Sequence, residues 1–166
     1  MSIISDSIAK HVRDIRNARV LAFPGINISR LSARLQRNPS LLSAPFSVIH
    51  VGTNDVHNLS EDEFMSDFNN LITIIRSVSD TNILLSSILP RPLDHIRTGS
   101  KLKEVNRRLK VLCSERSVKF LHSFRPFFKG GQPVRELFAV RDGGLHLNCE
   151  GTRRLRLFFI NTVAHL

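Results

Sequence analysis

The sequence predicts an α/β fold, a three-layer α/β/α sandwich in which helices cover both faces of a five-stranded parallel sheet. Apolar runs of strand length alternate with segments of helical periodicity along the chain. A helix after each strand supplies the crossover that consecutive parallel strands require. Apolar residues make up 42% of the 166 residues, which suffices for an ordinary core. We therefore expect one domain over residues 1–166.

The first half of the chain contains three predicted strands. Ser2–Ser5 holds a short apolar run and is the first strand, followed by a predicted helix over Ser7–Asn17. Arg19–Phe23 is the second strand, and the spacing of apolar residues then indicates a helix over Ile28–Gln36. Phe46–Val51 is the third strand. Nearly continuous apolar runs are typical of strands that are buried on both faces.

The second half begins with a helix that has a clear start signal. Ser60-Glu61-Asp62-Glu63 is a capping box, flanked by apolar residues placed as a hydrophobic staple. Apolar residues from Phe64 onward then recur at a spacing of about 3.6, which predicts a buried helix face. Ile83–Ile88 is the fourth strand, and Leu89-Pro90-Arg91-Pro92 ends it because proline cannot continue a central strand.

The remaining elements complete the alternation. An apolar stripe from Leu102 to Leu112 marks a helix, and Val118–Leu121 is the fifth strand. A long connection over Ser123–Arg141 follows. The last helix is predicted over Cys149–Val163, with Asn148 as its N-cap because asparagine is a preferred capping residue.

Residues with the chemistry of a hydrolase follow the strand ends. A serine hydroxyl becomes a good nucleophile when a base takes its proton, and imidazole titrates near neutrality. Ser7 is therefore a candidate nucleophile, His146 a candidate base, and Asp142 a candidate for the carboxylate that orients the ring. Ser7 and His146 also have purely structural explanations, since serine caps helices and a histidine can precede a helix on the surface. Likewise, Asn54 and Asp55 could form a turn after a strand, and Gly25 after Pro24 could be ordinary turn chemistry.

Four blocks, in this order, resemble the signature of the SGNH (GDSL-type) hydrolases. They are Ser5-Asp6-Ser7, Phe23-Pro24-Gly25, Gly52-Thr53-Asn54-Asp55, and the segment from Asp142 to His146. The resemblance covers nearly all 166 residues. It implies a flavodoxin-like sheet of strand order 2-1-3-4-5, whose switch point lies between the first and third strands. Ser7 and Asn54 would then flank the crevice in which such folds bind ligands.

The same resemblance implies a serine esterase that uses no metal and no organic cofactor. Its substrates would be small acyl esters, acetyl or lipid, cleaved through a triad of Ser7, His146 and Asp142 and an acyl-enzyme. The oxyanion would be bound by the backbone N–H groups of Ser7 and Gly25 and by the side-chain amide of Asn54.

Within the family, the chain is similar to the esterase domain in the first open reading frame of some LINE retrotransposons. The phrases that carry this similarity are His50–Asp55, Ile88–Arg91 and Leu145–Asn148. The first predicted strand starts almost at Met1, which favours a domain that is part of a longer chain. The similarity to retrotransposon proteins implies that the chain comes from a mobile element.

Two departures from the family pattern concern the proposed site. The first block begins with Ser5 where the family has glycine, and a side chain there could crowd the exit from the first strand. Asp142 and His146 are four positions apart, where the family has three. We expect Gly143-Gly144 to bulge and let the carboxylate still reach the ring. On the sequence alone, deleting Gly144 should keep or raise activity.

Other sites and functions are less well supported. His50, Asp55 and His57 could be imagined as metal ligands, but one lies inside a strand and another beyond its end, so we predict no metal site. The chain lacks a Gly-rich phosphate loop and a Gly-x-Ser-x-Gly elbow, which argues against an NTPase and an α/β-hydrolase. A non-catalytic, basic nucleic-acid-binding module of a mobile element is the alternative reading, and a decayed copy with neither activity is a third.

The charge balance points to anionic partners. Lys and Arg number 24 against 14 Asp and Glu, a net charge of +10, which favours RNA or anionic lipid as a partner of the basic surface. The chain has no Trp or Tyr to stack on bases, so contacts to nucleic acid would be made mainly with phosphates. No apolar run reaches the roughly 18 residues of a membrane span. Cys113 and Cys149 fit two reduced cysteines in the cytoplasm.

Overall fold

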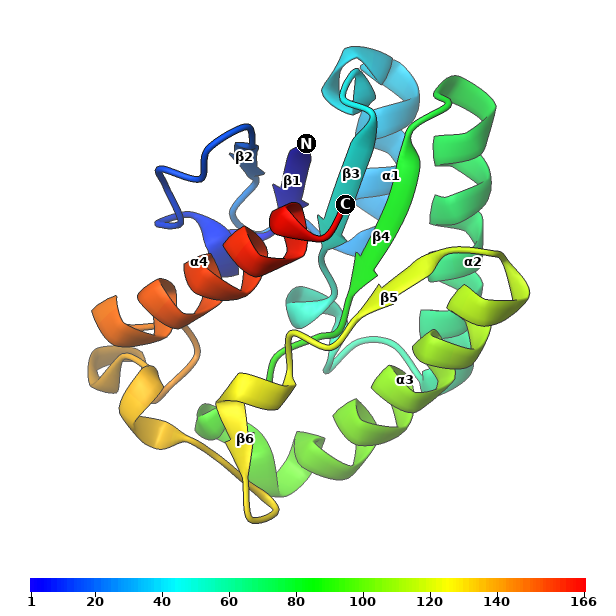
Figure 1. Cartoon of the computed structure of the whole chain (residues 1–166). Helices are drawn as coiled ribbons and strands as arrows, with labels where there is room; N and C mark the ends of the chain where they lie inside the picture. Colours follow the sequence, from blue (N-terminus) through cyan, green and yellow to red (C-terminus); the bar gives the residue numbers. More distant parts are fainter.

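A five-stranded parallel sheet forms the centre of the computed structural model, which describes residues 1–166 (Figure 1). Its strand order is β2-β1-β3-β4-β5, and every neighbouring pair is parallel. The strands are β1 Ser2–Ser5, β2 Arg19–Ala22, β3 Phe46–His50, β4 Asn82–Ser86 and β5 Lys119–Leu121. The predicted fold class and strand order are confirmed.

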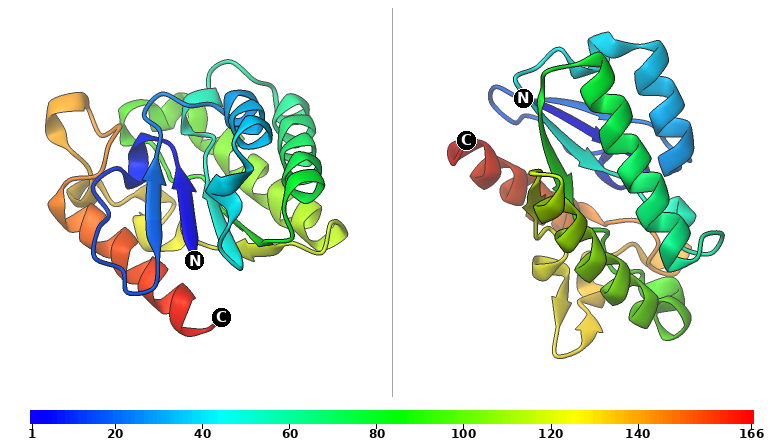
Figure 2. Two further views of the ribbon diagram at one scale, coloured as in Figure 1. Left: turned by 90° about the horizontal axis from the view of Figure 1, so that it is seen from above. Right: turned by 90° about the vertical axis from the view of Figure 1, so that its right-hand side faces the viewer.

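Helices cover both faces of the sheet, as Figures 1 and 2 show. The helices are α1 Ile28–Arg37, α2 Glu61–Val78, α3 His95–Glu115 and α4 Cys149–Ala164. Successive strand residues point to opposite faces. Ile4, Ile49 and Leu85 lie in one buried cluster with α1, α2 and α3, whereas their neighbours Ile3, Val48 and Leu84 lie in a second cluster with α4. The continuous apolar runs of the strands therefore serve two separate cores.

The helix predicted over Ser7–Asn17 is wrong. Only a single 3-10 turn, Ser7–Ala9, forms at its start. Asp14 and Asn17 have φ angles of 55° and 61°, in the left-handed region where a right-handed helix cannot continue. The guanidinium of Arg156 in α4 donates to the carbonyl of Asp14 and to that of the preceding residue, at 2.7 and 2.8 Å. A distant side chain thus satisfies backbone groups that helix formation would otherwise have used.

The other predicted helices and strands are present, with most ends shifted by one or two residues. The capping box of Ser60 and Glu63 is confirmed at the start of α2. Helix α3 starts at His95, well before its predicted apolar stripe. The connection predicted over Ser123–Arg141 contains a two-stranded hairpin, β6 Phe128–Lys129 with β7 Gln132–Pro133. None of the helices combines the length and apolar character of a membrane span.

Candidate active site

Three loops meet at the carboxyl edge of the sheet, where the strand order reverses. Ser7 opens the turn η1, Ser7–Ala9, directly after β1. Asn54 lies in another 3-10 turn, η3 Thr53–Asp55, which two residues separate from the end of β3. Gly25 follows β2, the other neighbour of β1. The topology therefore places these loops at the crevice in which folds of this kind bind ligands.

A buried carboxylate joins the first two loops. Asp6 is fully buried and caps η1, accepting hydrogen bonds from the N–H of Ile8 at 3.0 Å and from the N–H of Thr53 at 3.3 Å. Burial raises the pKa of Asp6 to about 6, although these hydrogen bonds act in the opposite direction. Because one oxygen serves each loop, Asp6 fixes the distance between the turn of Ser7 and the turn of Asn54.

A second carboxylate and an amide join the Asn54 turn to the Gly25 loop. Asp55 Oδ2 accepts from the N–H of Ile28 at the start of α1, at 3.2 Å. Asn54 Nδ2 donates to the carbonyl of Ile26 at 2.8 Å, which leaves its second amide hydrogen available. Gly25 has a φ of 76°, and its N–H makes no hydrogen bond within the protein. Two donors expected of an oxyanion hole therefore lie in directly linked loops.

Ser7, His146 and Asp142 come together in a chain of two short contacts. His146 Nε2 lies 3.0 Å from Ser7 Oγ, and His146 Nδ1 lies 2.8 Å from Asp142 Oδ2. All three side chains are partly exposed, so a ligand can reach them. With the proton of the neutral ring on Nδ1, Nε2 is free to accept the serine proton. The arrangement can thus move a proton away from a hydroxyl while a carboxylate orients the ring.

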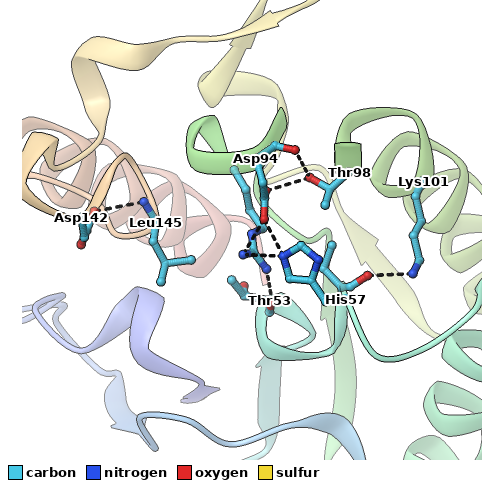
Figure 3. Close-up of polar contacts among 9 residues, drawn as sticks. Thr53, His57, Asp94, Thr98, Lys101, Asp142 and Leu145 are labelled. Atoms are coloured by element: carbon cyan, nitrogen blue, oxygen red, sulfur yellow. Dashed lines mark hydrogen bonds and ion pairs between the residues drawn. The ribbon is translucent and has the colours of Figure 1, made fainter. Parts of the chain in front are cut away.

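The extra residue between Asp142 and His146 is accommodated by a tight turn. Asp142 Oδ1 accepts from three successive N–H groups, those of Gly144 at 3.2 Å, Leu145 at 3.0 Å and His146 at 3.4 Å, the second of which is drawn in Figure 3. Gly143 and Gly144 have φ angles of 69° and 93°, which favour glycine. Burial raises the pKa of Asp142, but the hydrogen bonds from the ring and backbone together lower it below its ordinary value.

Ser5 fits into the sheet without disturbing it. It pairs with Ala22 of β2 and His50 of β3, so β1 stays hydrogen-bonded on both sides at its last residue. The Ser5 hydroxyl is buried and has no hydrogen-bond partner. The crowding that its side chain could cause at the exit from β1 leaves the strand pairing intact.

The three residues considered as metal ligands do not converge. His50 is buried within the sheet, where its Nδ1 lies 2.8 Å from Ser86 Oγ and burial lowers its pKa to about 4. His57 is on the surface and contacts Asp94 at 2.6 Å. Asp55 binds the backbone of α1, as described above. No three histidine, cysteine or carboxylate side chains cluster with metal-ligand spacing anywhere in residues 1–166.

A buried arginine that the sequence analysis did not single out braces the Asn54 turn. Arg91 donates to the carbonyl of Thr53 at 2.9 Å and pairs with Asp94 at 2.8 Å. The ring of His57 contacts the same carboxylate of Asp94 (Figure 3). Lys101 of α3 donates to a carbonyl just after the turn, at 2.7 Å. The signal in the sequence was an arginine between two prolines directly after a buried strand. We interpreted this segment as the end of that strand and as part of the subfamily resemblance, and assigned Arg91 no role in the site.

Solved structures of ester hydrolases share this fold. A member of the lipolytic G-D-S-L family from Veillonella parvula superposes with a TM-score of 0.81 at 16% identity, covering 99% of this chain and 98% of the other. A GDSL-like lipase from Bacteroides thetaiotaomicron gives a TM-score of 0.80 at 15% identity, covering 99% and 87%. The esterase domain of the zebrafish ZfL2-1 retrotransposon ORF1 protein is 28% identical, with a TM-score of 0.56 and coverage of 99% and 98%.

The sequence itself supports the same relationship. A comparison with curated proteins gives no match, but residues 3–154 match the model of the GDSL-like lipase/acylhydrolase family. That segment includes the loops of Ser7, Gly25 and Asn54 and the turn from Asp142 to His146. The chain therefore belongs to the GDSL-like lipase/acylhydrolase family and is a carboxylic ester hydrolase of the SGNH type.

Proposed function

We propose that residues 1–166 form one serine esterase domain that hydrolyses small acyl esters, acetyl or lipid, through an acyl-enzyme. Ser7 is the nucleophile, His146 the general base and acid, and Asp142 the carboxylate that orients the ring. The observation that carries the proposal is the pair of contacts made by His146, at 3.0 Å to Ser7 Oγ and 2.8 Å to Asp142 Oδ2. Such a chain is recognised by geometry and roles, whatever the spacing in the sequence.

In the first half of the reaction, Ser7 Oγ attacks the ester carbonyl and His146 Nε2 takes the hydroxyl proton. The carbonyl oxygen becomes an oxyanion. The imidazolium then gives its proton to the alcohol oxygen as the carbon–oxygen bond breaks, which leaves Ser7 acylated. Asp142 stabilises the imidazolium through Nδ1 and remains ionised throughout, consistent with its lowered pKa.

The oxyanion is bound by the N–H groups of Ser7 and Gly25 and by the amide of Asn54. Support for this role comes from the free N–H of Gly25 and from the bond between Asn54 and the carbonyl of Ile26. Donors fixed before the reaction stabilise developing charge without having to reorient. In the second half, His146 takes a proton from water, the hydroxide attacks the acyl carbon, and the protonated ring returns that proton to Ser7 as the carboxylic acid leaves.

The test is the reaction of the chain with p-nitrophenyl acetate and with a fluorophosphonate probe, which labels only an activated serine. Ser7→Ala should abolish both hydrolysis and labelling while leaving the circular dichroism spectrum unchanged. Ser5→Ala is the matched control, since Ser5 lies two residues away, is buried and has no hydrogen-bond partner. Hydrolysis by Ser7→Ala at the parent rate would show that the nucleophile has been misassigned.

The second candidate is a non-catalytic, basic module of a mobile element that binds nucleic acid. The net charge of +10 favours binding to nucleic acid, and the 28% identity to the esterase domain of a retrotransposon protein supports only the origin in a mobile element. A basic surface binds phosphates regardless of sequence. A chain that fails to react with the probe but binds single-stranded RNA would support this candidate, and a chain that does neither would indicate a decayed copy.

A further inference from the structure

Two aliphatic side chains next to the candidate site are unusually exposed, and a third, half-exposed one lies beside them. Ile96 is 99% exposed and Val140 is 94% exposed, whereas no other large apolar side chain of the protein exceeds 51%, the value for Leu93. Aliphatic side chains this exposed gain nothing from folding, because burial is what makes apolar side chains stabilising. We call Leu93, Ile96 and Val140 the apolar rim.

The apolar rim is one continuous surface although its residues come from two segments. Leu93 and Ile96 line a hollow of about 750 Å³ together with Arg135 and Gly143. Val140 lines an adjoining hollow of about 220 Å³ with the same Arg135 and Gly143. The two segments are also in contact, since a Cβ added to Gly143 would lie 2.5 Å from Leu93 Cδ1.

The rim lies beside the residues proposed to carry out the reaction. Val140 begins the 3-10 turn Val140–Asp142, so the rim and the carboxylate that holds His146 share one turn. Leu93 lies in the 3-10 turn Pro92–Asp94, which packs against the glycine pair. A large surface that docked on the rim would therefore be brought next to Ser7.

Positive charge surrounds the rim. Arg97, Arg135 and Arg141 are exposed, and none of their side chains forms an ion pair or a hydrogen bond within the protein. Among the carboxylates of these segments, Asp94 is bound by Arg91 and Asp142 by His146, which leaves Glu136 as the one unpaired acid. Three unpaired cations against one unpaired anion favour an anionic partner.

We propose that the apolar rim docks on an anionic lipid surface. The three aliphatic side chains enter the boundary between headgroups and acyl chains, and Arg97, Arg135 and Arg141 lie against the phosphates. Exposed apolar groups flanked by arginine suit such a boundary, which offers both hydrocarbon and negative charge. RNA would use the arginines but leave the aliphatic groups in water. The inference rests on the proposed function in one respect, namely that docking presents lipid esters to Ser7.

The test is co-sedimentation of the 166-residue chain with vesicles of phosphatidylcholine, with and without phosphatidylserine. The parent should bind the mixed vesicles and bind pure phosphatidylcholine weakly. The double variant Ile96→Asp/Val140→Asp should lose roughly tenfold or more in affinity, because it removes the inserting groups and adds like charge. Val111→Asp/Leu157→Asp is the matched control, since these residues are also exposed aliphatics, on α3 and α4, and it should bind like the parent.

The fold of the test variant can be checked independently. Ile96 is the second residue of α3, where a carboxylate is favourable to the helix N-terminus, so an unchanged thermal melting curve is expected. The variant should also hydrolyse soluble p-nitrophenyl acetate at the parent rate. Ser7→Ala should bind vesicles like the parent, so vesicle binding without hydrolysis would refute the proposed function and leave the docking inference standing.

Three outcomes would overturn the docking inference. The first is vesicle binding by Ile96→Asp/Val140→Asp that equals the parent. The second is an equal loss of binding in the Val111→Asp/Leu157→Asp control, which would locate the effect in general surface charge. The third is displacement of the protein from vesicles by single-stranded RNA, where RNA binding depends on Arg135 and is unaffected by the aliphatic substitutions. That result would identify RNA as the partner of this surface.

Discussion

Replacement of Asp142 by asparagine tests whether this carboxylate sets the protonation of the histidine ring. Asparagine keeps an oxygen that can accept the N–H groups of Gly144, Leu145 and His146. In place of Oδ2 it presents an NH₂ group, which donates to His146 Nδ1. The ring must then carry its proton on Nε2, the nitrogen 3.0 Å from Ser7 Oγ, so it can no longer accept the serine proton.

The expected loss is about 10⁴-fold in kcat, the size found when the acid of a Ser–His–Asp triad becomes an amide. That factor corresponds to about 5 kcal/mol of activation free energy. Stability should change little in Asp142→Asn, because the three backbone hydrogen bonds to the turn persist. Asp142→Ala should lose a similar factor in kcat and also lower the melting temperature, because it removes the acceptor of those bonds.

The assay is the steady-state hydrolysis of p-nitrophenyl acetate by the parent, Asp142→Asn and Asp142→Ala, with thermal melts of all three. If Asp142→Asn kept kcat within about tenfold of the parent, the reasoning would fail, since a triad acid is worth far more. The site would then work as a dyad of Ser7 and His146, with the ring held by other contacts.

Four further outcomes follow from the structure. Asn54→Ala should lower kcat by roughly 10²–10³-fold if its amide binds the oxyanion, whereas Asn58→Ala, an exposed asparagine in the same loop, should not. Deleting Gly144, which the sequence alone favoured, should instead lower activity, because the turn needs its N–H and its φ of 93°. Burial raises the pKa of Asp6 to about 6, against 3.8 ordinarily. The contribution of its protonation to the stability of the fold is therefore complete below pH 3.8 and is lost as the pH rises through 6. Between pH 4 and pH 7, the free energy of unfolding of Asp6→Asn in urea should therefore rise by up to about 3 kcal/mol relative to that of the parent. The same pH dependence of unfolding in both proteins would contradict this prediction. If the basic surface binds single-stranded RNA through phosphates, filter-binding affinity should fall steeply between low and moderate salt with little sequence preference, and salt-independent binding would exclude that mode.

The fold was predictable where one local signal decided the structure. Each strand of the sheet is a short apolar run, and burial of both faces requires that composition. The segment Ser7–Asn17 failed for the opposite reason. Its apolar residues have helical spacing, but Asp14 and Asn17 turn left-handed and Arg156 binds the carbonyls from α4. No sequence window near residue 14 contains that arginine.

Those residues of the candidate site that belong to a recognisable sequence motif could be predicted. Ser7, Asn54 and His146 could be picked out because each stands at a strand end or before a helix in a recognisable block. Asp6 and Arg91 could not, because their roles depend on which loop lies within reach of a buried charge. The turn at Asp142 was anticipated as a glycine bulge, but the three N–H groups converging on one oxygen follow from geometry that spacing does not contain.

The buried charges around the site explain how a small domain could hold an oxyanion hole in place. Asp6 and Asp55 each accept a hydrogen bond from a backbone N–H of a different loop. Arg91 donates to the carbonyl of Thr53. Keeping such groups buried lowers stability, which is why burial raises the pKa of both carboxylates to about 6. In return, these bonds link the three loops that carry the proposed donors before a substrate binds, and preorganised donors supply much of the rate enhancement in acyl transfer. Asp6→Asn should accordingly lower kcat for p-nitrophenyl acetate without lowering the melting temperature at neutral pH, because one of the two oxygen acceptors that order the loops is lost while the cost of the buried charge is removed.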